Sequence, residues 1–235
     1  MDKQSITRYM IRRFGRKSLR FYRSLSAEYV NSTPTVIHVD PQRITKETRT
    51  NWGSLLDEPG LVLGGPWDKF TTDIDERQKV RALRVKLEDG APWDETDYYD
   101  RILQRIESGR SWRGCENEND LRTKLAEYEL IHDEMCESGY KTQKELDDDD
   151  FEPGNLRIGE IGVNIGRGGE LFWQDDGQSR LTLAKILELD KVPVEVLTRH
   201  KRWWQLRSEI ASCDSRFNLS QAARDNIDHP DMKDI

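Results

Sequence analysis

The chain has 235 residues, a net charge of −7 and a mean hydropathy of −0.85, with seven Trp, seven Tyr and six Phe to build a core. No apolar run approaches the roughly 18 residues of a transmembrane helix, and the first residues lack the apolar core of a secretory signal. The three cysteines are widely spaced, which argues against a disulfide scaffold or a thiolate zinc site. We therefore expect a cytoplasmic protein, too acidic for a general nucleic-acid coat but compatible with a local basic contact.

Basic residues dominate the N-terminal segment, residues 1–33. Seven Arg and Lys residues and no acid lie between Ile6 and Leu25, and arginines recur every four residues from Arg8 to Arg20. This spacing predicts an amphipathic helix with a basic stripe. We expect a peripheral helix whose basic face is solvated. The alternative is a contact of the Arg8–Arg23 segment with a nucleic-acid backbone or an anionic membrane surface.

Two short strands are expected next. Residues 35–40 form the first, closed by a proline, and residues 61–63 form the second. The second strand runs into a tight turn with two glycines and a proline. Asp40, Trp67 and Asp68 are candidates for lining a pocket, although a Trp after a turn is more often part of a core.

The middle of the chain, about residues 70–145, is expected to be a helical insertion. Capping residues, apolar residues at helical spacing and terminating glycines predict three helices. They span about residues 73–90, 92–108 and 120–139.

Two features of this region raise the question of metal binding. His132 and Cys136 are four residues apart, but no second pair completes a site, so no metal is assigned. The acidic run from Glu145 to Glu152 is interpreted as a solvated linker, with Mg²⁺ binding as the alternative.

Past Pro153 a hairpin is predicted. Residues 161–165 alternate apolar with small or polar side chains, as in a half-buried strand, and the glycines of residues 166–169 turn the chain into a second strand at residues 170–174. The glycine cluster superficially resembles a phosphate loop, but it leads into a strand and lacks the Gly-Lys-Ser/Thr ending. We therefore assign it no ligand.

The next turn combines three features of an anion site. Gly177 lets the backbone approach a ligand closely. The helix that begins there offers free N–H groups and the positive end of its dipole. Arg180 supplies a planar charge suited to phosphate oxygens. We predict that a phosphate-bearing ligand binds this turn, which consists of Asp176, Gly177, Gln178, Ser179 and Arg180.

The position of Arg180 on this helix decides what it contacts. Leu183, Ala184 and Leu187 follow it by three, four and seven residues, so Arg180 shares the face of the apolar stripe. An arginine on a buried face needs an internal acid or an anionic ligand. The alternative to a ligand is an ion pair, for which we consider Asp175, Asp176 and Glu195.

The last part of the chain is expected to contain one more strand and a tail. Valines alternate through residues 192–196 and lead to Arg199 and His200, which we add to the candidate pocket residues. The residues beyond Ser212 are polar and acidic. We expect residues 211–235 to form a loose tail without an assigned role.

Several runs of this sequence resemble the ParB/sulfiredoxin-like superfamily, whose pattern includes an opening strand, a turn with glycine and arginine, a helix and a Val-Pro-Val-type strand. The matching runs are Ile37-His38-Val39-Asp40-Pro41-Gln42-Arg43-Ile44, Asp176-Gly177-Gln178-Ser179-Arg180-Leu181, Ala184-Lys185 and Val192-Pro193-Val194-Glu195-Val196. Further runs look like an archaeal or viral branch of the family: Gly64-Gly65-Pro66-Trp67-Asp68, Gly139-Tyr140, and Arg199-His200 followed by Trp204.

The resemblance covers about residues 35–39 and 162–204. It implies an α+β fold with a small mixed sheet, in a domain at residues 34–210 that is interrupted by the helical insertion. It also implies a bound nucleotide, such as ATP with Mg²⁺, with Gly177 and Arg180 matching the phosphate-contacting residues. Ser179 stands where many members have His, so the role of that histidine is not carried over. No Cys lies in the turn, which disfavours sulfiredoxin chemistry.

Three functions follow as hypotheses. The first is a nucleotide-dependent, kinase-like phosphotransferase with Asp40, Asp68 or Asp176 as the base. The second is a noncatalytic nucleotide- or nucleic-acid-binding module. The third is an interaction adaptor that retains only the fold.

Overall fold

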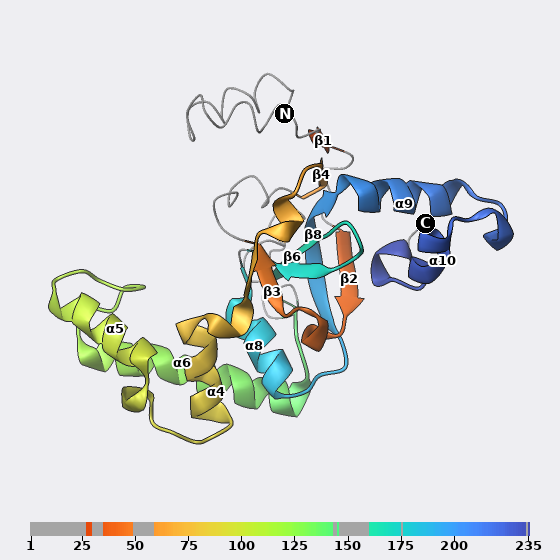
Figure 1. Cartoon of the computed structure of the whole chain (residues 1–235). Helices are drawn as coiled ribbons and strands as arrows, with labels where there is room; N and C mark the ends of the chain where they lie inside the picture. The colour runs from red at the N-terminus through yellow and green to blue at the C-terminus, as the bar shows by residue number, and fades with distance from the viewer. Residues whose placement is uncertain are drawn as a thin grey trace, which may run out of the picture.

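A computed structural model describes residues 27–29, 35–48, 59–142, 145, 160–174, 176–233 and 235. Within these residues the chain is an α+β protein built on a mixed sheet (Figure 1). The basic Arg8–Arg23 segment, residues 146–152 of the acidic run, and Asp175 lie outside the described residues. In the part that is described, no helix has both the length and the apolar character needed to cross a membrane.

The strand β8 (Val192–His200) lies at the centre of the sheet. On one side it pairs in parallel with β6 (Ile161–Ile165). On its other side, its first half pairs antiparallel with β2 (Thr35–Val39) and its end pairs in parallel with β4 (Leu61–Leu63). Because β8 has neighbours on both edges, it is almost continuously buried. The strand also includes Arg199 and His200, which the sequence placed after it.

The remaining strands extend the sheet at its two edges. The predicted hairpin is confirmed: β6 turns into an antiparallel partner, and further short strands follow. The expectation that its first strand is half-buried is wrong, because β6 is buried at all five positions, Asn164 included. From β6 outward the order is β7 (Leu171–Trp173), β3 (Lys46–Thr48) and β5 (Thr71–Asp73), and β1 (Ala27–Tyr29) pairs antiparallel with β4.

The helix α8 (Gln178–Ile186) connects β7 to β8 and packs against β6 and the helical insertion. Leu181, Leu183 and Ala184 are fully buried, as its apolar stripe predicts. Because these residues fix the buried face of α8, Arg180 points toward the interior, as expected, and its side chain is only 16% exposed.

The predicted helical insertion is also present, between β5 and β6. Figure 1 shows α5 lying away from the sheet, joined to it through α4 and α6. The first helix starts later than predicted, because Asp73 caps a 3-10 turn instead of the α-helix. The insertion consists of η4 (Ile74–Glu76), α4 (Gln78–Leu87), η5 (Trp93–Glu95), α5 (Asp97–Glu107) and α6 (Glu118–Ser138).

The expectation of a loose tail beyond Ser212 is wrong for the residues that the structure describes. After α9 (Lys201–Ser212) the chain forms η6 (Arg216–Asn218), α10 (Gln221–Asn226) and η7 (Pro230–Met232). Met232 and the side chain of Asp231 are buried. The polar composition was misleading because one of these acids neutralises buried arginines of the sheet and of α9.

Candidate functional site

The predicted phosphate turn begins with Gly177, which adopts the left-handed conformation at φ 74° and precedes α8. A Cβ atom at this position would lie 2.6 Å from the carbonyl oxygen of Glu160 and 2.6 Å from the Cα of Ile161. The close backbone approach that glycine allows is therefore made to the start of β6. Packing against the start of β6 therefore explains the glycine without a ligand.

Arg180 has an internal acidic partner, Glu160. One guanidinium nitrogen lies 3.6 Å from a carboxylate oxygen of Glu160, and the Glu160 side chain is 6% exposed. The hydroxyl of Tyr140 donates to the same oxygen at 3.1 Å. Burial, followed by the charge of Glu160, raises the pKa of Tyr140 well above its ordinary value. The prediction that Arg180 needs a partner is confirmed, and the acid with which it pairs, Glu160, is one that the sequence interpretation did not consider.

Three nitrogens at this turn have no hydrogen-bond partner among the residues that the structure describes. Gly177 contributes no side-chain cap, and among the described residues the amides of Gln178 and Ser179 have no hydrogen-bond partner. The side-chain nitrogen of Gln178 is buried and also lacks one there. Asp176 is exposed. The turn retains an uncapped helix start, whereas its arginine is engaged.

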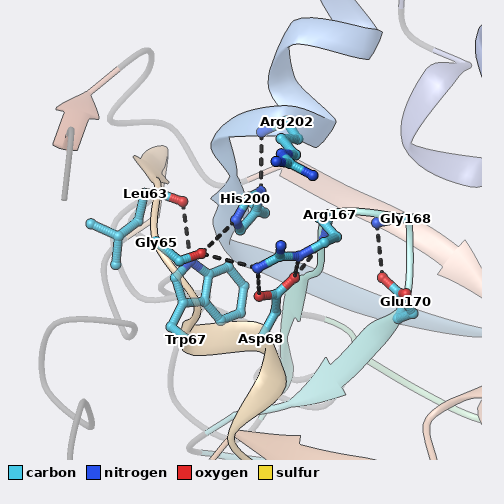
Figure 2. Close-up of polar contacts among 9 residues, drawn as sticks. All are labelled: Leu63, Gly65, Trp67, Asp68, Arg167, Gly168, Glu170, His200 and Arg202. Atoms are coloured by element: carbon cyan, nitrogen blue, oxygen red, sulfur yellow. Dashed lines mark hydrogen bonds and ion pairs between the residues drawn. The ribbon is translucent and has the colours of Figure 1, made fainter. Parts of the chain in front are cut away.

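The predicted pocket residue Trp67 is part of the core. It is fully buried, and its indole nitrogen donates to the carbonyl of Leu63 at 3.0 Å (Figure 2). The next residue, Asp68, receives three hydrogen bonds from Arg167, two from the guanidinium at 2.6 and 2.7 Å and one from the backbone at 3.1 Å. Burial alone would raise the pKa of Asp68, but these hydrogen bonds outweigh it and lower the pKa. Asp68 is therefore a charged anchor for the β6–β7 turn.

His200 lies beside this pair and fixes the turn before Trp67. Its Nδ1 accepts from the backbone N–H of Arg202 at 3.0 Å, so the proton sits on Nε2, which donates to the carbonyl of Gly65 at 2.9 Å (Figure 2). Burial lowers the pKa of His200. A neutral histidine with both nitrogens engaged caps α9 and holds a turn. It has no nitrogen left for proton transfer.

The other two predicted pocket residues lie elsewhere. Arg199 is buried and makes a two-pronged contact with Asp231, at 2.9 Å from Nε and 2.6 Å from Nη2. Asp40 caps η1 (Pro41–Arg43) and lines a separate cavity of about 410 Å³, together with Lys185. The structure thus brings Trp67, Asp68 and His200 together around one glycine turn and leaves Asp40 and Arg199 apart.

The structure reveals a different concave site on the helical insertion, which the sequence interpretation missed. We call it the arginine groove. It has a volume of about 480 Å³ and lies on α5 and the loop that follows. Its lining residues are Arg101, Ile102, Gln104, Arg105, Arg110 and Trp112.

The guanidinium groups of the arginine groove have no ion-pair partner among the described residues. Arg105 donates to the carbonyl of Ser111 at 3.2 Å and Arg110 to the hydroxyl of Ser108 at 3.2 Å, while Arg101 lies 5.5 Å from the ring centroid of Tyr98. All three arginines are exposed. None of the three forms an ion pair with a carboxylate that the structure describes.

A tight turn closes one end of the groove. Trp112 and Cys115 exchange two backbone hydrogen bonds, of 3.2 and 2.8 Å, across Arg113 and Gly114. Arg113 has φ 49° and Gly114 has φ 83°, so both central residues are left-handed, as in a type I′ turn. The guanidinium of Arg113 lies 5.6 Å from the ring centroid of Trp112. The basic and aromatic residues between 101 and 113 are the sequence signal that could have indicated this site.

Comparisons with known proteins add no assignment to these sites. No protein-family model, no curated protein sequence and no solved structure matches the chain. The geometry of the described residues therefore carries the functional argument.

Proposed function

We propose that the chain is a noncatalytic nucleic-acid-binding protein and that the arginine groove contacts the phosphodiester backbone. The observation that carries this proposal is a concave site with three exposed arginines that have no carboxylate partner among the described residues. Guanidinium groups match phosphate oxygens in geometry and charge. Neutralising phosphates and releasing their counterions is the main source of affinity for nucleic acids.

The neighbouring cations of the insertion provide the contrast. Arg84 pairs with Glu88 at 3.0 Å, and Arg122 pairs with Glu118 at 2.8 Å. The three arginines of the groove have no such ion pair among the described residues, although carboxylates of α5 lie nearby in the sequence. Other described cations of the insertion, such as Arg81 and Arg113, also lack an ion pair. What supports an anionic partner is that three such guanidinium groups line one concave site.

The shape of the groove favours a nucleic acid over a membrane surface. Membrane-binding surfaces present exposed apolar side chains beside their basic residues. The large exposed apolar side chains among the described residues lie outside the groove: Val36, Phe70, Leu130, Ile131, Phe217 and Ile235. The groove itself is concave, and its apolar lining residues, Ile102 and Trp112, are buried or partly buried rather than exposed.

Binding of a labelled oligonucleotide, measured at about 50 and 200 mM salt, tests this proposal. We expect the affinity to fall with salt, and substitution of Arg101, Arg105 and Arg110 by Gln to reduce the salt slope by roughly 0.7 to 0.9 for each phosphate that is no longer neutralised. Arg122→Gln is the matched control, because it removes one positive charge from an ion-paired position. Equal binding by the triple variant and the wild type would contradict the proposal.

A second candidate function is nucleotide binding, for example of ATP with Mg²⁺, at the start of α8. The unpartnered amides of Gln178 and Ser179 support it. Ser179→Glu is a sharp test, because a negative charge there favours the helix dipole but repels a phosphate. We expect this variant to keep its stability and lose any thermal shift with nucleotide, whereas Ser179→Ala keeps that shift. An equal shift in both variants would exclude this site.

The geometry gives less support to phosphotransfer. Of the carboxylates considered as base, Asp68 is held by Arg167 and Asp40 lies at a separate cavity from the turn. We retain as proposals a ParB/sulfiredoxin-like arrangement of β6, β7, α8 and β8 and a cytoplasmic location. An experimental structure compared strand by strand with that superfamily, and localisation of the tagged chain in cells, test these two proposals.

A further inference from the structure

We infer that the nucleic acid bound in the arginine groove is single-stranded and that one of its bases stacks on Trp112. This inference rests on the function proposed above and adds the form of the ligand. Single strands are bound by a basic groove combined with an aromatic ring, because their bases are free to stack. A duplex keeps its bases paired and offers mainly its phosphates to such a groove.

Trp112 is held in a fixed position at the groove. Its ring packs edge-to-face with Tyr98, at a centroid distance of 6.2 Å and an interplanar angle of 86°. Its backbone is bridged to Cys115, which is buried. Trp112 remains partly exposed and lines the groove. A ring fixed by its neighbours loses little conformational freedom when a base stacks on it.

Arg113 adds a further positive charge next to Trp112. The residue is exposed, and its guanidinium lies 5.6 Å from the ring centroid of Trp112. Its left-handed position is one that Asn, Asp and Gly adopt more readily. A guanidinium at this place is close enough to the indole to neutralise a phosphate next to a stacked base.

The arginines of α5 are arranged along one line. Arg101 and Arg105 are four residues apart and face the groove from successive turns, about 6 Å apart along the helix axis. Arg110 and Trp112 face it from the loop. A single strand laid in the groove would place phosphates against the arginines and a base against the indole.

The test is equilibrium binding of the full chain to labelled single-stranded oligonucleotides of roughly ten nucleotides and to the matching duplexes. We expect tighter binding of the single strand. Trp112→Leu should weaken single-strand binding about tenfold and weaken duplex binding much less. Trp204→Leu is the matched control, because Trp204 on α9 is also half-buried and has Arg207 at 5.9 Å from its ring centroid.

Arg113→Asn keeps the test decisive if Trp112→Leu disturbs folding, because Asn is favoured in this turn. We expect it to weaken single-strand binding while the folded state stays intact. Equal affinities for the two forms, equal effects of Trp112→Leu and Trp204→Leu, or heparin binding as tight as that of the single strand would each overturn the inference. If these results occur while the triple arginine variant still fails to bind, the proposed function stands without the inference. Absence of binding to either form overturns both.

Discussion

His200 and His229 make the same pair of hydrogen bonds at two different places in the chain. In each, Nδ1 accepts from the backbone N–H two residues later, and Nε2 donates to a glycine carbonyl, Gly65 for His200 and Gly169 for His229. The two histidines cap α9 and η7. Each therefore ties the start of a C-terminal helix to a glycine turn of the sheet.

This arrangement predicts a loss of stability in mild acid. Burial lowers the pKa of both histidines below the ordinary value of about 6.5. Below that pH the unfolded chain takes up protons that the folded chain excludes, so the free energy of unfolding decreases as pH falls. We expect stability contributed by the histidines to be full above about pH 6.5 and to fall below it, until the folded histidines are protonated as well.

Urea unfolding across this pH range measures the effect. His200→Asn is the informative variant, because Asn can still accept from the helix amide but does not titrate. We expect it to reduce the pH dependence of the free energy of unfolding in this range, while the contribution of His229 remains. A pH profile identical to that of the wild type would show that His200 is not kept neutral by the fold.

The pair of Arg180 and Glu160 predicts that removing the arginine alone destabilises the chain more than neutralising both side chains. Arg180→Ala leaves a buried carboxylate without its cation, which costs about 3 kcal/mol in the free energy of unfolding. A double variant with Glu160→Gln should recover part of that loss. Chemical denaturation of the two variants gives the comparison. If Arg180→Ala has the same free energy of unfolding as the wild type, the guanidinium is not held by Glu160. Arg180 could then bind a phosphate at the start of α8.

The folded C-terminal residues predict that Asp231 is essential for stability. Asp231 contacts Arg199, Trp203 and Arg207, and its side chain is fully buried. Asp231→Ala should destabilise the chain by about 3 to 5 kcal/mol, because buried cations lose a carboxylate. Asp228→Ala, at an exposed position of the same segment, should have little effect. Similar unfolding free energies for the two variants would contradict the buried contact.

The left-handed residues predict stabilising substitutions. Arg113→Asn and Glu188→Asn should each raise the free energy of unfolding by about 1 kcal/mol, because Asn adopts positive φ more readily. The measurement is thermal unfolding combined with nucleic-acid binding. Only Arg113→Asn should affect binding, since Glu188 lies outside the arginine groove. A gain in binding with Arg113→Asn would remove the reason for an arginine there.

Gly90 and Gly177 allow the cost of a positive φ to be measured separately from the cost of a crowded Cβ atom. Gly90 and Gly177 have φ 72° and 74°, but a Cβ atom would meet nothing within 4 Å at Gly90 and a carbonyl oxygen at 2.6 Å at Gly177. Gly90→Ala should cost about 1 kcal/mol. Gly177→Ala should cost about 1 to 3 kcal/mol more, from overpacking. Equal destabilisation in thermal unfolding would mean that the packing against β6 relaxes freely.

The sequence predicted the elements that carry a clear period. The alternation in β6 and the apolar stripes of the helical insertion placed those elements correctly. The sequence did not indicate β1, β3 or β5, because these three-residue strands are mostly polar, whereas the equally short β4 and β7 consist of apolar residues. The spacing of apolar residues thus located β6 and the helical insertion, but it did not locate the short strands β1, β3 and β5.

The candidate site was less predictable, because partners across the chain decide it. The inward position of Arg180 followed from helical phase, but Glu160 lies 20 residues earlier, before β6 and β7, where no local pattern connects the two. Arg199 finds its acid 32 residues later, in a segment whose composition indicated a tail. In α5 the apolar face was recognised. That its exposed arginines have no carboxylate partner among the described residues is a property of the folded chain alone.

The central place of β8 has a consequence during synthesis. Three strands, β2, β4 and β6, pair with β8, and all three precede it in the chain. These three strands are therefore synthesised before β8 exists. The edge of each strand that pairs with β8 stays unpaired in the nascent polypeptide until residue 200 has been made. Chaperones that shield open strand edges would act on this chain late in translation, after the helical insertion has already emerged.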